Sequence, residues 1–268
     1  MKILVIGGGN MGLTYALSFL NSQVVAPKDM MILEKSSDRV QELNKLKIGK
    51  IFNKFEDCIP LADLIILAVK PQDSTDLFQN IRRNGRSDQI FLSIMAGVRM
   101  KTITEGLGSE KVVRAMPNLP SHIREGMTVF TSTNEITREE LIKIQNLLNT
   151  TGKTLYVQNE DLVDSATAIS GSGPAYVFYF MDSLMEAAKK LGFDSAEAEL
   201  LVWQTFQGTV DLFQKNNLTC EEWIKRVSSK GGTTEAAIKS FRTAELRDTI
   251  IKGTEAAFHR AKELGDKN

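Results

Sequence analysis

The 268-residue sequence predicts an α/β domain followed by an all-α domain, and three observations support this. Short apolar runs alternate with helix-like segments as far as about residue 160. A glycine-rich stretch follows the first apolar run directly. Beyond about residue 160 the strand-like runs stop, and long segments with an apolar period of about 3.6 residues begin. We therefore expect one domain over residues 1–160 and a second, helical domain over residues 161–268.

The composition is typical of a soluble globular protein, with 42% hydrophobic and 25% charged residues. Lys and Arg together number 33, as do Asp and Glu, so the formal net charge is zero and no basic excess indicates nucleic-acid binding. No apolar run is long enough to span a membrane, and the N-terminus lacks a signal-peptide pattern. Cys58 and Cys220 have no metal-ligand spacing. We expect a cytoplasmic protein without a metal, nucleic acid or membrane as a partner.

The chain opens with a dinucleotide-binding pattern. An apolar run over residues 2–6, consistent with a buried parallel strand, is followed at once by G-x-G-x-x-G, with Gly7, Gly9 and Gly12 in register. These glycines allow a tight turn, a close approach of the backbone to a pyrophosphate, and close packing of a helix on the strand. The pattern predicts a Rossmann domain with a doubly wound, mostly parallel sheet.

A helix over 14–21 and a strand over 30–33 that ends at Glu34 complete this first unit. A carboxylate at that strand end accepts hydrogen bonds from the adenosine ribose, which favours NADH. The basic and hydroxyl residues over 35–39 are equally suited to hold the 2′-phosphate of NADPH. Both cofactors stay open, with a slight preference for NADH because an anionic Glu34 would repel the phosphate.

The alternation of strands and helices continues beyond this unit. Further strands are expected over 64–69, 90–95, 112–115, 127–131 and 154–157, and helices over 40–47 and 138–150. Three of these strands end in small or proline-containing loops, which begin near Lys70, Ala96 and Met116. Ligands of open α/β sheets bind at the carboxyl ends of the strands. These loops are therefore expected to form the rim of one nicotinamide pocket.

The helical part contains recognisable helix ends. Residues 170–174 open a helix that Gly192 ends, and residues 194–197 and 219–222 have the pattern of capping boxes. The last two helices are expected over 235–241 and about 244–264. The apolar stripes of this part are too extensive for it to bury alone, which predicts a dimer formed by packing or exchange of helices.

A small polar loop over residues 228–234 leads directly into the helix that begins near Glu235. The Gly231-Gly232 pair lets backbone amides turn toward a ligand, and a helix N-terminus adds unpaired donors. This combination suits a carboxylate or a phosphate. The alternative is a capped helix that follows an ordinary turn.

Four separated blocks of the chain resemble pyrroline-5-carboxylate reductases, the last enzymes of proline synthesis. The blocks are residues 6–12, 68–71 with 96–97, 114–118, and 170–176 with 228–234. The likeness covers nearly the whole chain, and the last block is the most specific. The resemblance implies an N-terminal domain that binds NADH or NADPH and a helical domain that dimerises, with dimers that commonly associate into a ring of five.

The resemblance also implies roles for individual residues. Cofactor binding falls to Ile6, Gly7, Gly9, Asn10, Met11 and Gly12 at the pyrophosphate, to Glu34, Lys35 and Ser36 at the ribose, and to Ala68, Val69, Lys70, Pro71, Ala96 and Asn118 at the nicotinamide. Substrate binding falls to Glu160, Ser229, Gly231, Gly232, Thr233 and Thr234. Thr234 is the expected catalytic residue, with its hydroxyl near the ring nitrogen. Lys230 stands where the family usually has proline, Leu119 where threonine is common, and Lys225 where an acid is frequent.

The expected reaction is the reduction of a cyclic imine, 1-pyrroline-5-carboxylate, to L-proline. A protonated imine is already a good electrophile, so the reaction requires alignment with the nicotinamide rather than a buried acid–base pair. One alternative is a β-hydroxyacid dehydrogenase-like enzyme or another imine reductase. The dehydrogenase would carry a lysine early in its first long helix, where this chain has none before Lys189. Another alternative is a non-enzymatic NAD(H)-sensing protein, which would need no substrate loop.

Overall fold

The computed structural model describes the backbone of residues 1–266 and the side chains of residues 1–263. Within these residues, contacts divide the chain into two compact units. The sheet unit comprises Met1–Ser172 and the end of the last helix from Ala257 on, and the helical unit comprises Gly173–Ala256. The domain boundary expected after residue 160 stays a prediction, and residues 267 and 268 lie outside the described residues.

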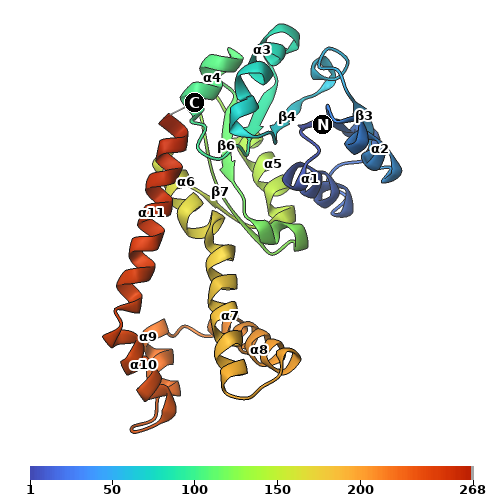
Figure 1. Ribbon diagram of the computed structural model, residues 1–268. Coiled ribbons are helices and arrows are strands. Elements are labelled where there is room, and N and C mark those ends of the chain that lie inside the picture. Colours follow the sequence, from blue (N-terminus) through green and yellow to red (C-terminus); the bar gives the residue numbers. More distant parts are fainter. Residues whose placement is uncertain (267–268) are drawn as a thin grey trace. The chain divides into compact units, whose positions relative to one another are not determined.

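The described strands form one eight-stranded sheet, in the order β3-β2-β1-β4-β5-β6-β7-β8. Figure 1 shows the ribbon of the chain, with β3, β4, β6 and β7 labelled. The strands are β1 (Ile3–Ile6), β2 (Met30–Leu33), β3 (Lys50–Phe52), β4 (Leu64–Leu67), β5 (Ile90–Ser93), β6 (Val112–Met116), β7 (Gly126–Ser132) and β8 (Gly152–Tyr156). Neighbouring strands pair in parallel, except for the antiparallel pair β6–β7. The predicted doubly wound, mostly parallel sheet is confirmed. The strand order reverses between β1 and β4, which is where ligands of such sheets bind.

Helices cover both faces of the sheet. The helices of the sheet unit are α1 (Asn10–Asn21), α2 (Ser37–Lys45), α3 (Ser74–Asn84), α4 (Met100–Leu107), α5 (Arg138–Leu148) and α6 (Asp161–Ala166). Alternate residues of β1 point to opposite faces: Ile3 and Val5 pack in one cluster with α1 and α5, and Leu4 and Ile6 in another with α3 and α4. Strands buried on both faces explain why their sequences are continuous apolar runs rather than alternating ones.

Some predicted boundaries were wrong. The first helix begins at Asn10 rather than residue 14, because Gly9 in extended conformation is its N-cap. The strands predicted over 64–69 and 90–95 end earlier, at Leu67 and Ser93. The elements β3, α3 and α4 were not predicted. Both helices have apolar residues at helical spacing, namely Leu77, Phe78 and Ile81 in α3 and Ile103 and Leu107 in α4, so the signal was present in the sequence and was overlooked.

The helical unit consists of α7 (Gly173–Lys190), α8 (Ser195–Gln214), α9 (Cys220–Val227), α10 (Thr233–Thr243) and the first part of α11 (Leu246–Asp266). The two predicted capping boxes are confirmed, with Asp194 and Thr219 as the N-caps of α8 and α9. Helix α7 begins at Gly173, and it is preceded by a π turn over Thr167–Gly171. None of the described helices is long and apolar enough to cross a membrane.

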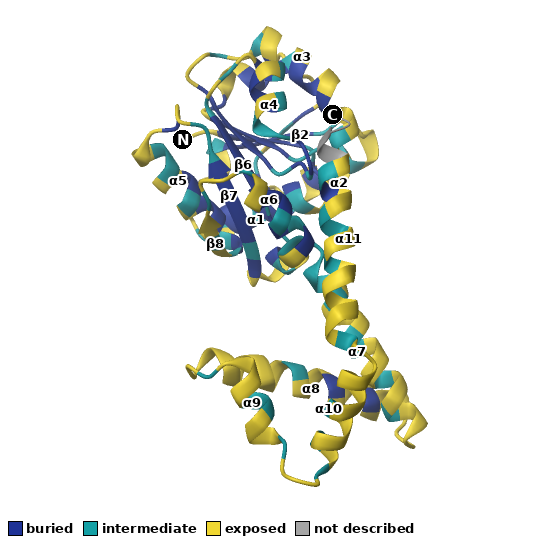
Figure 2. Cartoon of the chain, turned by 90° about the vertical axis from the view of Figure 1, so that its left-hand side faces the viewer, coloured by how far each residue is buried: buried dark blue, intermediate teal, exposed yellow. Residues whose placement is uncertain are grey.

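The apolar side chains of the helical unit are largely exposed in the chain described here (Figure 2). Ala198 and Val202 of α8 are buried. Exposed large apolar side chains occur on each of its main helices and include Phe178, Tyr179, Leu184, Leu200, Trp203, Phe213 and Phe241. An apolar surface of this extent is typical of a face that a protein partner covers.

Candidate cofactor cleft and substrate loop

The glycines after β1 have the geometry that the sequence pattern predicts. Gly7 has φ of +103°, a left-handed conformation that favours glycine, and its amide donates to the carbonyl of Leu33 at 3.0 Å. A Cβ at Gly12 would overlap the carbonyl oxygen of Gly7. A Cβ at Gly9, in contrast, would meet nothing within 4 Å. Gly7 and Gly12 therefore serve the turn and the packing of α1, and Gly9 keeps open the space above them.

The N-terminus of α1 is available to an anion. Gly9 is its N-cap, and within the described residues no side chain caps the first turn. That turn holds no acidic residue, so the amides of Asn10, Met11 and Gly12 face outward without a competing carboxylate. Unpaired amides and the positive end of the helix dipole suit a pyrophosphate. The residues present therefore fit a dinucleotide, with Ile6 supplying the buried strand end before the turn.

Glu34, which directly follows β2 at the strand end where the ribose is expected, contacts the glycine turn formed by residues 7–12. Its Oε2 accepts the amide of Gly8 at 2.9 Å, and its Oε1 accepts the amide of Ser36 at 2.9 Å. Arg39 holds the other end of the same residue, because its Nε donates to the carbonyl oxygen of Gly8 at 2.8 Å. Its NH1 pairs with Glu42 at 2.6 Å. Gly8 is thus fixed on both sides by side chains of opposite charge.

Lys35, the next residue, contacts the far side of the ribose loop. Its Nζ lies 3.0 Å from the carboxylate of Asp76 in the first turn of α3, and 5.2 Å from the ring centroid of Phe55. The Lys35–Asp76 pair is exposed, so it contributes little to stability. It leaves the lysine charge partly neutralised.

The residues expected around the nicotinamide follow the carboxyl ends of β4, β5 and β6. The amide of Ala68 extends the β1–β4 pairing by donating to Ile6, and Val69 follows it, half-buried. The exposed Lys70 precedes a short 3-10 turn that begins at Pro71. Ala96 is half-buried in the loop that leads from β5 to α4.

Asn118, the last residue of this set, forms hydrogen bonds within the protein through both Oδ1 and Nδ2 of its side chain. Its Oδ1 accepts the amide of Met127 at 2.8 Å, and its Nδ2 donates to the carbonyl of Ser170 at 3.0 Å. The carboxamide therefore fastens the π turn and the start of β7 to the segment after β6.

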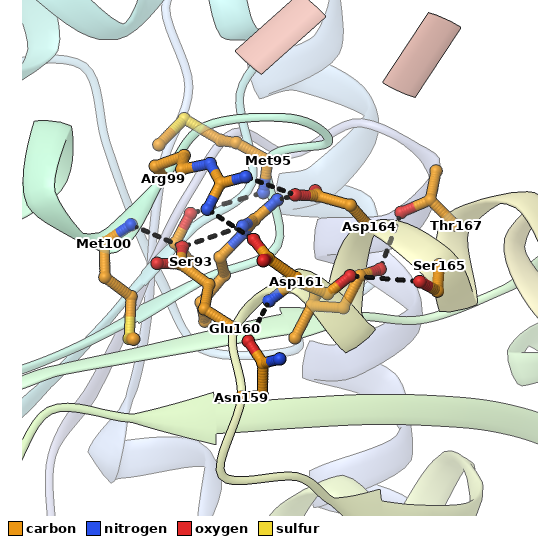
Figure 3. A network of polar contacts seen from close by, with 12 residues as sticks. Ser93, Met95, Arg99, Met100, Asn159, Glu160, Asp161, Asp164, Ser165 and Thr167 are labelled. Atoms are coloured by element: carbon orange, nitrogen blue, oxygen red, sulfur yellow. Dashed lines mark hydrogen bonds and ion pairs between the residues drawn. The ribbon is translucent and has the colours of Figure 1, made fainter. Parts of the chain in front are cut away.

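Sequence reasoning missed a cluster of charges beside this edge of the sheet. The Arg114 ion cluster consists of Arg99, Arg114, Glu160, Asp161 and Asp164. Figure 3 shows Arg99 together with Glu160, Asp161 and Asp164. The guanidinium of Arg114, only 1% exposed, pairs with Glu160 at 2.7 Å and with Asp164. An arginine inside the apolar run of β6 was the available signal, because a buried charge requires a partner.

The cluster gives Glu160 a structural role. Its Oε1 accepts from Arg114 and, at 2.7 Å, from the amide of Met100 at the start of α4. Arg99 completes the cluster from its edge, where its hydrogen bond holds the pKa of Asp161 below the usual range. The expected contact of Glu160 with substrate stays a prediction.

A second contact that the sequence did not reveal joins α1 to the segment after β6. The hydroxyl of Thr14 lies 2.5 Å from Nδ1 of His122 and donates to the carbonyl of Asn10 at 2.8 Å. Since a hydroxyl has one proton, Nδ1 of His122 is the donor when both bonds are made. His122 therefore braces the first turns of α1.

The substrate loop lies within the helical unit. The amide of Gly232 donates to the carbonyl of Ser229 at 3.0 Å, and Gly231 has φ of +75°, which fits a type II turn. Helix α10 follows with Gly232 as N-cap and, among the described residues, without a side-chain cap. Thr233 and Thr234 occupy its first turn, and the half-buried Thr234 hydroxyl makes no hydrogen bond within the described chain.

A groove of about 860 Å³ borders this loop, between α9 and α10. Its lining includes Ser228, Gly231 and Gly232 together with three cations, Lys225, Lys239 and Arg242, and two acids, Glu221 and Glu235. The unpaired amides at the start of α10, beside this small excess of positive charge, suit an anionic group such as a carboxylate. The pairing of Gly231 and Glu235, whose carboxylate accepts the Gly231 amide at 2.7 Å, holds the turn against the helix.

Comparisons with known proteins decide the family. A family model described as pyrroline-5-carboxylate reductase dimerisation matches residues 160–264, and one described as NADP oxidoreductase, coenzyme F420-dependent, matches residues 2–97. The chain is 32% identical to pyrroline-5-carboxylate reductase 2 of Bacillus subtilis, over 99% of this chain and 96% of that protein. The chain belongs to the pyrroline-5-carboxylate reductase family.

Solved structures of this reductase family agree with that assignment. The reductase of Coxiella burnetii has a TM-score of 0.90 and 31% identity, with 98% of each chain covered. The reductase of Plasmodium falciparum, solved with NADP bound, has a TM-score of 0.89 and 27% identity, over 99% of this chain and 98% of that one. The likeness confirms an oxidoreductase with a nicotinamide cofactor and leaves NADH and NADPH open. The individual residues expected to bind cofactor and substrate stay predictions.

Proposed function

We propose that this chain reduces 1-pyrroline-5-carboxylate to L-proline with NADH or NADPH. The observation that carries the proposal is the likeness to named reductases along the whole chain, which includes both the glycine turn and the substrate loop. Neither the dehydrogenase alternative nor the sensor alternative explains a match over the helical part, where the family model is that of a reductase.

In the proposed mechanism, the chain orients the reactants and the cofactor supplies the hydride. The α1 amides and the open space at Gly9 would hold the pyrophosphate, and the loops after β4 and β5 would border the nicotinamide. The unpaired amides at the start of α10 would hold the substrate carboxylate, next to a turn in which the Gly231 and Gly232 amides already donate to Glu235 and Ser229. Hydride adds to the imine carbon, and the electron pair of the C=N bond stays on nitrogen, which already carries the proton of the imine.

Thr234 is proposed to act at that nitrogen. Its hydroxyl makes no other hydrogen bond within the described chain, so it is available to the nitrogen while the imine carbon changes from planar to tetrahedral. A donor that is positioned for the transition state contributes about 10²-fold or more to the rate. The competing explanation is that Thr234 only favours the start of α10.

We favour NADH as the preferred cofactor. Glu34 is fixed by two backbone amides with its carboxylate at the ribose end of β2, which disfavours a phosphate there. Arg39, the cation best suited to a 2′-phosphate, already pairs with Glu42 and binds Gly8. Lys35 is similarly committed to Asp76.

We also propose a homodimer formed through the helical unit, with dimers that associate further, up to five per ring, and a cytoplasmic location. The match to a dimerisation model over residues 160–264 and the exposed apolar side chains of α7 and α8 support the dimer. The ring of five rests on the family resemblance alone.

Two substitutions of Thr234 test the mechanism. Thr234→Ala is expected to lower kcat about 100-fold and to leave the Kd of the cofactor nearly unchanged. Thr234→Ser keeps the hydroxyl and is expected to retain much of the activity. Steady-state rates and melting temperatures of both variants are the measurements. Normal turnover of Thr234→Ala together with a lowered melting temperature would show that Thr234 serves only the helix start.

A further inference from the structure

The Arg114 ion cluster lies wholly within the sheet unit, and its central pair is buried. The side chains of Arg114 and Asp164 are 1% and 2% exposed, and they join β6 to α6. Glu160, at 18% exposure, pairs with the same guanidinium from the residue before α6. Arg99 reaches Asp161 at 2.8 Å and Asp164 at 3.5 Å from the more exposed side.

Stability alone does not account for this cluster. Burial of an ion pair costs desolvation free energy, and proteins with apolar residues of similar volume in its place are often as stable or more stable. The Nε of Arg114 adds to that cost, since it is buried without a hydrogen-bond partner among the described residues. The presence of a buried ion pair despite this cost indicates that the segments it joins, β6 and α6, must be held in a fixed position.

The cluster fixes the beginning of the segment 160–171. Glu160 binds both Arg114 of β6 and the amide of Met100, the first residue of α4. The start of α6 is thereby tied to the sheet and to the helix that follows the loop containing Ala96.

Asn118 fixes the end of the same segment. It lies just beyond β6, and its Nδ2 donates to Ser170 in the π turn. Gly171 of this turn also packs closely on Met116, because a Cβ there would meet the Met116 side chain at 2.9 Å. The segment 160–171 is therefore fastened along β6 at both ends, by Arg114 and by the residues at the carboxyl end of the strand. Single-turn π segments of this kind are frequent at functional sites.

We propose that Arg114 is a positioning residue for hydride transfer. It touches no reacting atom; through Glu160 and Asp164 it holds the start of the segment 160–171 and, through the Met100 amide, the end of the loop after β5. These segments border the carboxyl edge of the sheet where the nicotinamide is expected. The proposal rests on the proposed function. Displacements of about 1 Å at such supporting segments can lower rates by about 10²-fold.

Arg114→Lys tests this role without removing the buried positive charge. A lysine donates from a single point and cannot bridge Glu160 and Asp164 as the planar guanidinium does. The matched control is Lys111→Met, which breaks the 2.7 Å ion pair with Glu140 directly before the start of β6. Both variants disturb a close ion pair in or next to β6, but only the first releases the segment 160–171.

For Arg114→Lys we expect kcat to fall about 10- to 100-fold, the Kd of the cofactor to change less than about threefold, and the isotope effect with 4-deuterated cofactor to increase. We expect Lys111→Met to lower the melting temperature with kcat unchanged. Equal effects of the two variants on kcat, or an unchanged kcat in Arg114→Lys, would overturn the proposal.

Amide hydrogen exchange separates this proposal from the proposed function. Residues 161–172 are expected to exchange faster in Arg114→Lys than in the wild type or in Lys111→Met. If the wild type fails to reduce the imine, the proposed function is wrong. If exchange over 161–172 is unchanged in Arg114→Lys, Arg114 does not fix the segment, whatever the reaction of the wild type is.

Discussion

At the scale of single residues, Gly9 and Gly12 perform two tasks that both require a small residue. Gly12 allows contact between α1 and the backbone at Gly7, whereas Gly9 borders open space at the helix N-terminus. The first task concerns folding and the second concerns the approach of a ligand. The two glycines of one motif are therefore expected to fail in different ways when they are replaced.

Gly9→Val should abolish cofactor binding while the fold survives, because the new side chain fills the pyrophosphate approach and its Cβ meets no protein atom within 4 Å. Gly12→Ala should instead destabilise the protein by about 1–3 kcal/mol, since its Cβ overlaps a backbone oxygen. Calorimetric titration with the cofactor and thermal melts distinguish the two outcomes. Retained cofactor affinity in Gly9→Val would contradict the assignment of the glycine turn.

Glu34→Ala should weaken NADH binding more than NADPH binding. The substitution removes both the acceptor for the ribose hydroxyls and the anion that repels a 2′-phosphate. A charge-assisted hydrogen bond of about 1.5–3 kcal/mol corresponds to a change of tenfold or more in the ratio of the two Michaelis constants. Glu34→Gln, which keeps the size of the side chain, is the control for the loss of its grip on Gly8. Equal changes for both cofactors would remove Glu34 from the ribose site.

At the scale of elements, the substrate loop explains one departure of this chain from its family. Lys230 occupies the second position of the Ser229–Gly232 turn, and proline is favoured there in type II turns. Its amide makes no hydrogen bond within the described residues. A lysine is tolerated, but it leaves the unfolded chain more freedom than proline would.

Lys230→Pro should therefore raise the free energy of unfolding by about 0.4–1 kcal/mol. Urea denaturation of the variant and the wild type measures the difference. Lys230→Ala, which restricts the backbone less, should show little of this gain. A destabilised proline variant would mean that the loop is not the turn described here.

The elements also show what local sequence can and cannot predict. The glycine turn, β1, β2 and the capping box at Asp194 were predictable, because their signals lie within a few neighbouring residues. Arg114 and Asp164 are 50 residues apart, and their pairing depends on how α6 packs on β6. The π turn was not predictable either, since Asn118 and Met116 hold it from a distant part of the chain. The structural bonds of Glu160 were hidden for the same reason.

At the scale of the whole molecule, the helical unit presents an apolar surface that a partner subunit would cover. Its helices expose many large apolar side chains, for example Tyr179 at 74% and Leu200 at 62%. Covering them with a second copy would make stability depend on protein concentration. Activity measured at several protein concentrations therefore belongs to any test of the enzyme.

The most direct test of the central claim is the formation of proline by the purified protein. The protein is incubated with 1-pyrroline-5-carboxylate and either NADH or NADPH, and both cofactor oxidation and proline are measured. The account predicts one proline formed for each reduced cofactor consumed, with a higher kcat/KM for NADH than for NADPH. Absence of proline at every protein concentration, with cofactor bound but not oxidised, would contradict it.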